Sequence, residues 1–181
     1  MARAIEGDYK IPAGLRSLSI EETCNYAFFD NFLDYKIYKV NKVENEDYQH
    51  DYIIGYHRND VFNKVAKVYF NKVKEYYEVD TIYVSEDFRR DGLATKLYTY
   101  FVTKQNFIIL GSDMQRFGAR KLWSKLSKCE YLNVSIIDFE TGEIIDSNVR
   151  IYHGLEDGDF DSRVWSSDNE KRHIRLILKC I

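Results

Sequence analysis

Residues 81–94, which read TIYVSEDFRRDGLA, decide the fold. The segment Thr81–Val84 is β-branched and aromatic, and this predicts a strand. A short polar loop follows, and Gly92 opens a predicted helix that runs to about Gln105. The first N–H groups of a helix have no partner inside it, and together with the helix dipole they attract anions. The stretch therefore predicts a phosphate or pyrophosphate site at the junction of strand and helix.

Small and basic residues lie at this junction. Gly92 has no side chain and Ala94 has a small one, so a phosphate group can approach the backbone closely. Arg89 and Arg90 can add charge-assisted hydrogen bonds. A solvated pair of surface arginines beside an ordinary helix start is the alternative interpretation of the same residues.

The segments after the junction predict a crossover connection. Phe107–Leu110 is a short apolar run, which is typical of a buried strand. Strand, helix and strand in this order predict a right-handed crossover and a parallel strand pair. A second helix over about 117–128 is indicated by apolar residues at helical spacing, namely Ala119, Leu122, Trp123 and Leu126.

The rest of the chain supplies mainly strands. A capping box, Ser19 to Glu22, precedes apolar residues at helical spacing and predicts a helix over 19–33. Segments rich in Tyr and β-branched residues predict strands, at 35–40, 51–56, 65–70, 77–84, 131–139 and 173–180, with a turn at 140–143 and a returning strand at 144–145. No internal repeat or linker interrupts the chain, so we predict a single α+β domain over residues 1–181. Its parts are an N-terminal helical segment (1–34), a core (35–128) and C-terminal strands with an acidic insertion (129–181).

Composition excludes several classes of protein. The 181 residues are 45% hydrophobic and include 15 Tyr and 11 Phe, which is too many for a disordered chain. The longest apolar run is Phe107–Leu110, far short of the ~20 residues that span a bilayer, and residues 1–10 lack a signal pattern. The net charge of -3 argues against general binding of nucleic acid. We therefore expect a cytoplasmic protein that does not bind membranes.

The cysteines and histidines indicate neither a disulfide framework nor a metal site. Cys24, Cys129 and Cys180 are far apart in the chain, and we expect reduced, mostly buried thiols. The four His are scattered, without the paired spacing of a zinc site, so no metal is expected.

The loop and its surroundings resemble a known family. Residues 89–94, RRDGLA, fit the pattern Q/R-x-x-G-x-G/A, the pyrophosphate loop of the GNAT superfamily of N-acetyltransferases. The resemblance is good over about 78–128 and only topological elsewhere. It implies a GNAT-like mixed, mostly antiparallel sheet with a central splayed parallel strand pair and helices on both faces. The segments GLATKLY, SDxQ and LWxKL, which begin at Gly92, Ser112 and Leu122, also resemble a branch found in tailed-phage genomes.

The resemblance implies that residues 35–128 bind an acyl-CoA, and acetyl-CoA is the expected co-substrate. Backbone N–H groups of the loop would hold the CoA pyrophosphate, and the strand edge before it would pair with the pantetheine amides. The N–H near Val84 would meet the developing oxyanion of the thioester. The implied cofactor-binding residues are Ile82, Tyr83, Val84, Arg89, Arg90, Asp91, Gly92, Leu93, Ala94, Thr95 and Trp123.

Attack on a thioester requires a neutral amine, so a base or a water molecule must take a proton. Glu78 lies eleven residues before Arg89, and histone-acetylating members of the family carry a general-base Glu at that offset. Asp80 is two residues further on and is expected on the same strand face. A solvated strand-end carboxylate is the alternative for both residues.

Ser112 and Asp113 are the other two candidate catalytic residues. If Phe107–Leu110 is the family's fifth strand, both residues lie at the mouth of the parallel pair. A hydroxyl there can bind pantetheine, and a carboxylate can orient an amine. Capping of the following helix is the alternative role.

The departing thiolate needs a proton or good solvation. Many members of the family use a Tyr on the fourth helix, but the matching position here is Trp123, whose indole N–H is not an acid in that sense. Tyr131, Tyr98, Ser112 or a water molecule are the candidate substitutes.

The leading hypothesis is an acyl-CoA-dependent N-acyltransferase that acts on a primary amine of a protein or small molecule. The acidic stretch Glu156–Asp161 can attract a cationic acceptor, or it is a solvated loop. One alternative is a phage enzyme that modifies a nucleobase or DNA on this fold, in the host cytoplasm. Another is a catalytically inactive GNAT-like module that binds or inhibits a partner. A homodimer is compatible with the sequence.

Overall fold

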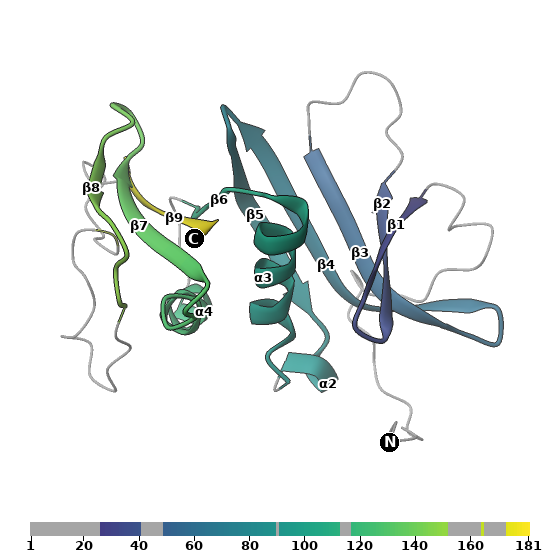
Figure 1. Cartoon of the computed structure of the whole chain (residues 1–181). Helices are drawn as coiled ribbons and strands as arrows, with labels where there is room; N and C mark the ends of the chain where they lie inside the picture. Colours follow the sequence, from purple (N-terminus) through teal and green to yellow (C-terminus); the bar gives the residue numbers. More distant parts are fainter. Residues whose placement is uncertain (1–25, 41–48, 90, 113–116, 152–163, 165–172) are drawn as a thin grey trace.

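A nine-stranded sheet forms the framework of the protein (Figure 1). The computed structural model describes residues 26–40, 49–89, 91–112, 117–151, 164 and 173–181. The strands are β1 (Tyr26–Phe32), β2 (Tyr35–Val40), β3 (Gln49–Arg58), β4 (Val61–Val73), β5 (Tyr76–Val84), β6 (Ile109–Leu110), β7 (Leu132–Asp138), β8 (Ile144–Asp146) and β9 (Ile174–Cys180). The helices are α2 (Glu86–Arg89), α3 (Leu93–Gln105) and α4 (Phe117–Leu126).

The sheet is mixed and mostly antiparallel, as predicted. Its strand order is β1-β2-β3-β4-β5-β6-β9-β7-β8, and β5 with β6 is its one parallel pair among the described strands. The crossover through α3 produces this pair, because a parallel connection must return the chain to the same end of the sheet. The strand predicted over Phe107–Leu110 is shorter than expected. Only Ile109 and Leu110 pair, while the Phe107 ring stacks on the Tyr77 ring at 3.6 Å between centroids.

A β-bulge interrupts β5 at Asp80. Tyr69 of β4 lies opposite Thr81, but the next residue, Phe70, lies opposite Val79, so Asp80 is the additional residue. A bulge bends its strand and breaks the alternation of faces. This explains why Val79 and Val84, which are five residues apart, both belong to the main hydrophobic core.

The predicted helix over 19–33 is wrong where the structure describes it. Residues Tyr26–Phe32 form strand β1, which pairs with β2, while 19–25 lie outside the described residues. The apolar spacing that indicated a helix includes Phe28 and Phe32, but a bulge at Phe29 interrupts the strand between them, and Phe28 is 55% exposed whereas Phe32 is only 6% exposed. Both aromatic side chains contact other elements: Phe28 packs edge-on against Tyr38 of β2, and Phe32 packs edge-on against Tyr100 of α3.

An aromatic cluster joins α3 to the sheet. The Phe101 ring of α3 lies 4.9 Å from the Tyr52 ring and 5.0 Å from the Phe70 ring, and all three side chains are fully buried. Aromatic rings in such tilted or edge-on contact stabilise the folded state by more than the burial of their surface area alone would. The position of α3, and with it the position of its first turn, therefore depends on β3 and β4.

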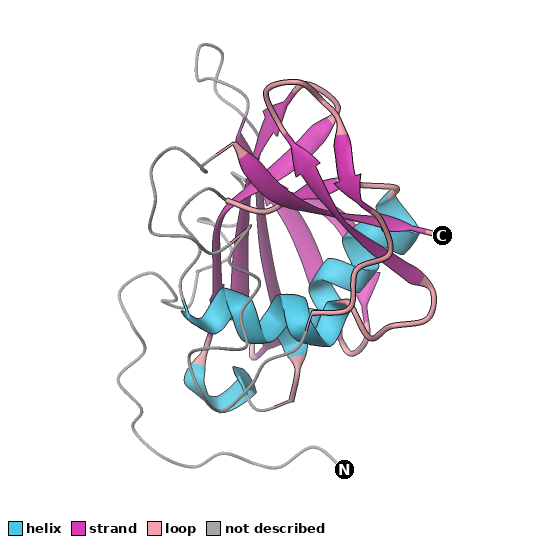
Figure 2. Ribbon diagram, turned by 90° about the vertical axis from the view of Figure 1, so that its left-hand side faces the viewer, coloured by secondary structure: helices cyan, strands magenta, loops and turns pink. Residues whose placement is uncertain are grey.

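Helices α3 and α4 contribute to the same core. Trp123 of α4 packs edge-on against Tyr98 of α3, with 6.3 Å between ring centroids. In Figure 1 α3 is seen from the side and α4 along its axis, and Figure 2 shows α4 from the side, so the two helices cross. Helices on both faces of the sheet stay a prediction.

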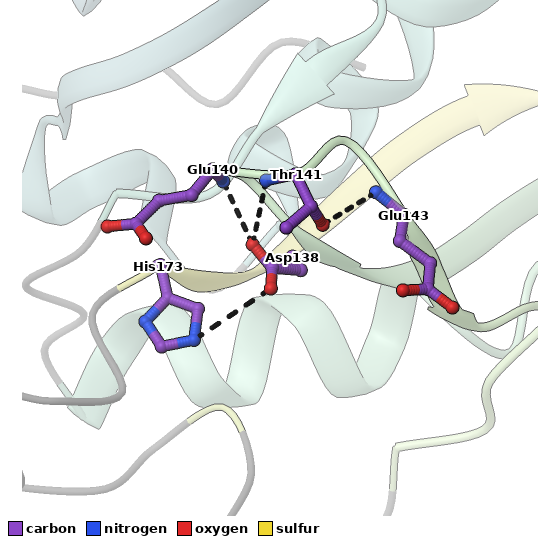
Figure 3. A network of polar contacts seen from close by, with 5 residues as sticks. All are labelled: Asp138, Glu140, Thr141, Glu143 and His173. Atoms are coloured by element: carbon purple, nitrogen blue, oxygen red, sulfur yellow. Dashed lines mark hydrogen bonds and ion pairs between the residues drawn. The ribbon is translucent and has the colours of Figure 1, made fainter.

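Side-chain contacts of Asp138 hold the turn between β7 and β8, the last two strands in the order of the sheet (Figure 3). One carboxylate oxygen of Asp138 accepts hydrogen bonds from the backbone N–H groups of Glu140 and Thr141, at 2.9 and 3.1 Å. The other oxygen lies 4.0 Å from Nε2 of His173, just before β9. An Asx turn of this kind supports the turn predicted at 140–143.

The cysteine prediction is only partly right. Cys129 is half-buried, but Cys180 is exposed at the end of β9, and Cys24 lies outside the described residues. Regular alternation along β9 would place Cys180 on the same face as the buried Leu176 and Leu178. The strand ends there, and Ile181, the next residue, is also exposed.

A polar contact attaches β1 to α3 and supplies a first prediction. The Tyr100 hydroxyl donates to Oδ2 of Asp30 at 2.5 Å, and Gln105 Nε2 donates to the Tyr100 hydroxyl at 2.8 Å. The Tyr100 hydrogen bond, followed by the bond from the Asn31 backbone, holds the pKa of Asp30 below its ordinary value of 3.8. Asp30 therefore contributes stability above pH 3.8, and the contribution is lost as pH falls through the pKa of the folded state.

We expect Tyr100→Phe to lower the free energy of unfolding by about 1 kcal/mol at neutral pH. The variant should also lose less stability than the wild type as pH falls below 3.8. Urea unfolding at several pH values measures both effects. Tyr98→Phe, in a buried tyrosine of the same helix, is the control and should keep the wild-type pH dependence. Equal pH dependence in all three proteins would remove the link between Tyr100 and Asp30.

Candidate active site

The N-terminus of α3 carries peptide N–H groups that nothing in the helix satisfies. The first helical hydrogen bond runs from Lys96 N to Gly92 O at 3.1 Å, so the N–H groups of Leu93, Ala94 and Thr95 precede it. Gly92 is the N-cap and provides no side-chain hydrogen bond, and the first turn contains no acidic residue. The positive end of the helix dipole is thus left for an external anion.

Gly92 shapes this opening in two ways. Its φ is +68°, a left-handed conformation that costs side-chain-bearing residues energy. A Cβ built at this position would have no atom of the described residues within 4 Å, so the described structure leaves space beside the backbone. The glycine therefore permits both the turn into α3 and the close approach of a ligand to the first N–H groups.

Arg89 points back to the strand in this structure. Its Nε donates to the Val84 carbonyl at 2.9 Å, its Nη1 lies 3.4 Å from Glu86, and its guanidinium lies 5.7 Å from the Tyr83 ring centroid. These contacts tie the loop to the end of β5. Asp91 is exposed, and Arg90 lies outside the described residues.

The edge of β5 facing away from β4 is the second part of the site. Ser85 N donates to Val65 O at 2.9 Å, so Ser85 directs its peptide groups to β4. Alternate residues of an antiparallel strand point their N–H and C=O groups to opposite edges. Ile82 and Val84 therefore present theirs to the other edge, consistent with the Arg89 bond to Val84. On that edge the ladder with β6 consists of Tyr77–Ile109 and Glu78–Leu110, and β5 continues six residues beyond Glu78.

Glu78 is held by an arginine that the sequence analysis missed. Nη1 of Arg175 in β9 lies 2.7 Å from Oε1 of Glu78, and the two side chains are 14% and 19% exposed. The sequence carried no local signal for this pair, because 97 residues separate the partners. Alternation along the last strand indicated only that Arg175 lies on the face opposite Leu176 and Leu178.

The predicted relation between Glu78 and Asp80 does not hold as stated. Asp80 is the bulged residue, so the alternation that placed both on one face is interrupted between them. Asp80 is exposed, and its Oδ2 accepts from the Thr81 hydroxyl at 3.2 Å.

The remaining predicted residues lie at different depths. Ser112 is half-buried directly after Gly111, whose N–H donates to Leu176 O at 2.8 Å, and Asp113 lies outside the described residues. Trp123 is 2% exposed and belongs to the core, so a ligand contact would require it to move.

The candidate acids are also separated. Tyr98 is buried beside Trp123, and this burial raises its pKa above the ordinary 10.0. Tyr131 is exposed at the start of β7. A proton from Tyr98 would therefore require a rearrangement that brings its hydroxyl to the surface.

Within the described ranges, no group of three or more His, Cys, Asp or Glu side chains is arranged to hold a metal ion. Nor is any described helix long and apolar enough to cross a bilayer.

These features define a class of protein. Strand β5 presents peptide groups at one edge and leads, through α2, to the open N-terminus of α3, which can receive an anion. This arrangement is expected for a protein that binds a carrier with a pyrophosphate group. Residues 18–127 match the Acetyltransferase (GNAT) family. The match covers more than half of the chain, and the chain therefore belongs to the GNAT family of acyl-CoA-dependent acyltransferases. No curated protein and no solved structure matches the chain.

The Gly92 position gives a direct test of the anion site. We expect Gly92→Glu to weaken CoA binding at least about tenfold, because a carboxylate would occupy the approach to the helix N-terminus. Isothermal titration with CoA measures the effect. Gly142→Glu is a matched control, since Gly142 also has a positive φ of 78° and open space at its Cβ, but lies in the β7–β8 turn. Equal weakening in both variants, or in neither, would remove the assignment.

Proposed function

We propose that the protein transfers an acetyl group from acetyl-CoA directly to a primary amine of a protein or small molecule. One observation carries the proposal: the glycine-capped N-terminus of α3, open and without a side-chain cap, follows β5 after the short helix α2. The family membership supports an acyl-CoA co-substrate. The acetyl group and the amine acceptor are the further steps of the proposal.

The two parts of the site suit the two ends of CoA. The pyrophosphate would accept hydrogen bonds from the N–H groups of Leu93, Ala94 and Thr95. The pantetheine arm would then run along β5 and pair with the peptide groups of Ile82 and Val84. This arrangement requires β5 and β6 to part beyond Glu78 and Leu110, and the end of the described ladder there supports it.

The reaction would be a direct displacement. The amine nitrogen attacks the carbonyl carbon of the thioester, the negative charge on the carbonyl oxygen is met by an N–H of the β5 edge near Val84, and the C–S bond then breaks. The nitrogen loses a proton to a base, and the CoA thiolate gains one. Holding both substrates side by side supplies much of the rate enhancement.

Two carboxylates are available for the proton of the amine. Asp80 is exposed at the bulge, and Glu78 lies at the last residue paired with β6. A direct displacement also fits the described cysteines. Cys180 is five residues along β9 from Arg175, and Cys129 follows α4, so neither lies on the β5 edge.

A binding module without catalysis is the second candidate. The observation that favours it is Trp123, which occupies the position of the usual Tyr and is buried. Both candidates bind CoA, but only the enzyme consumes the thioester.

The proposal predicts turnover of acetyl-CoA with at least one amine in a panel of L-lysine, spermidine and a peptide with a free N-terminus. Loss of thioester absorbance measures the rate, and mass spectrometry detects the acetylated amine. Gly142→Glu should turn over like the wild type, and Gly92→Glu should be impaired. CoA binding without turnover for any amine would favour the binding module, and absence of both would overturn the proposal.

Asp80→Asn tests the exposed carboxylate at saturating amine. If Asp80 takes the proton, the variant should lose about a hundredfold in kcat with little change in KM for acetyl-CoA. Asp87→Asn is the control, since Asp87 is an exposed carboxylate in α2, the short helix that follows β5. An unchanged kcat in the Asp80 variant would assign the proton to Glu78 or to water.

A further inference from the structure

The ion pair between Arg175 and Glu78 lies where the strand ladder changes. Glu78 is the last residue of β5 that pairs with β6, opposite Leu110. On its other side, Leu110 pairs with Ile177 of β9, and Gly111 N donates to Leu176 O. Because β6 and β9 are antiparallel, Arg175, which precedes Leu176 in β9, lies level with the residue after Gly111. The pair thus connects β5 to β9 just beyond the end of β6, the short strand between them.

The surroundings keep this connection in place. The Arg175 guanidinium lies 4.8 Å from the ring centroid of Phe139, and the Tyr76 ring packs edge-on against the same Phe139 ring, with 6.0 Å between the two centroids. Tyr76 and Phe139 pack against a small buried cluster of Leu110, Ile137 and Ile177, which is separate from the main core. A charged pair at 2.7 Å with most of its surface covered is held more firmly than an exposed pair.

Glu78 also lies two residues before Asp80, the bulged residue of β5. The peptide groups of Ile82 and Val84 follow the bulge. The direction in which those groups point depends on where the bulge begins. An anchor at Glu78 fixes that point from the side of β9.

We propose that Arg175 is a positioning residue for acyl transfer: it holds the Glu78 carboxylate, and through it the bulged segment of β5, in the geometry that the reaction requires. This inference rests on the proposed function. Oε1 of Glu78 bonds to Arg175, and in this proposal Oε2 is the oxygen that accepts the proton of the amine. Arg175 itself acts through Glu78 and touches neither substrate.

Arg175→Met tests the inference, and Lys74→Met is its matched control. Lys74 also lies 4.8 Å from the Phe139 ring and donates from Nζ to Phe139 O, so it shares the aromatic neighbour of Arg175. Both variants exchange a cation over the same ring for Met. We expect Arg175→Met to lower kcat between about tenfold and about a hundredfold, because a small displacement of the reacting groups suffices for such a loss. KM for acetyl-CoA should change by less than about twofold, since the N-terminus of α3 is intact.

Lys74→Met should keep the wild-type kcat. Three further variants complete the experiment: Arg175→Lys, Glu78→Gln, and the double variant of Glu78→Gln with Arg175→Met. Arg175→Lys should recover part of the loss in kcat, because an ammonium can still bond to Glu78. The double variant should have a kcat no lower than that of the poorer single variant, since the two residues act as a unit. Thermal unfolding and circular dichroism confirm that each variant is folded.

The outcomes separate this inference from the proposed function. A folded Arg175→Met variant with wild-type kcat would overturn the positioning role and leave acyl transfer standing. Equal losses in the Lys74 and Arg175 variants would assign the effect to the Phe139 region and also overturn it. A wild-type protein that neither binds CoA nor consumes acetyl-CoA would overturn both proposals.

Discussion

Peptide groups of a central strand require hydrogen-bond partners along both edges. On the edge of β5 that faces away from β4, the described pairing with a neighbouring strand ends at Glu78. β4 pairs with β5 as far as Val84, but the described ladder with β6 stops at Leu110. Beyond it, the peptide groups of Ile82 and Val84 are presented toward the edge that faces away from β4. The same strand leads through α2 into α3, so the edge of β5 at Ile82 and Val84 and the N-terminus of α3 follow each other along the chain. A ligand with amides at one end and phosphates at the other matches this order.

The rest of the molecule keeps these backbone groups in place. Phe101 fixes α3 on the aromatic side chains of β3 and β4, and Arg89 ties the loop to the Val84 carbonyl. On the other side, Arg175 connects Glu78 to β9. Binding by backbone groups requires such support, because a main-chain N–H can be aimed only by fixing the segment that carries it.

The fold around the loop was predictable because its signals are local. Segments rich in Tyr and β-branched residues located the strands from Tyr35 to Val84, and Gly92 after a polar loop located the start of α3. The helix predicted over 19–33 failed at β1. Phe28 and Phe32 stand at helical spacing, but pairing with β2 makes this segment a bulged strand. A capping box before them is a weak local preference, which tertiary contacts override.

By itself, the sequence determined the strand, loop and helix of residues 81–105 and the glycine that lets a phosphate approach the backbone, because these depend on neighbouring residues. Only the tertiary structure decided that Asp80 is bulged, that Trp123 is buried and that Arg175 meets Glu78. Each of these depends on strand register or on a partner distant in the chain, up to 97 residues away. Neither composition nor periodicity contains that information, since register is settled when whole elements pack together.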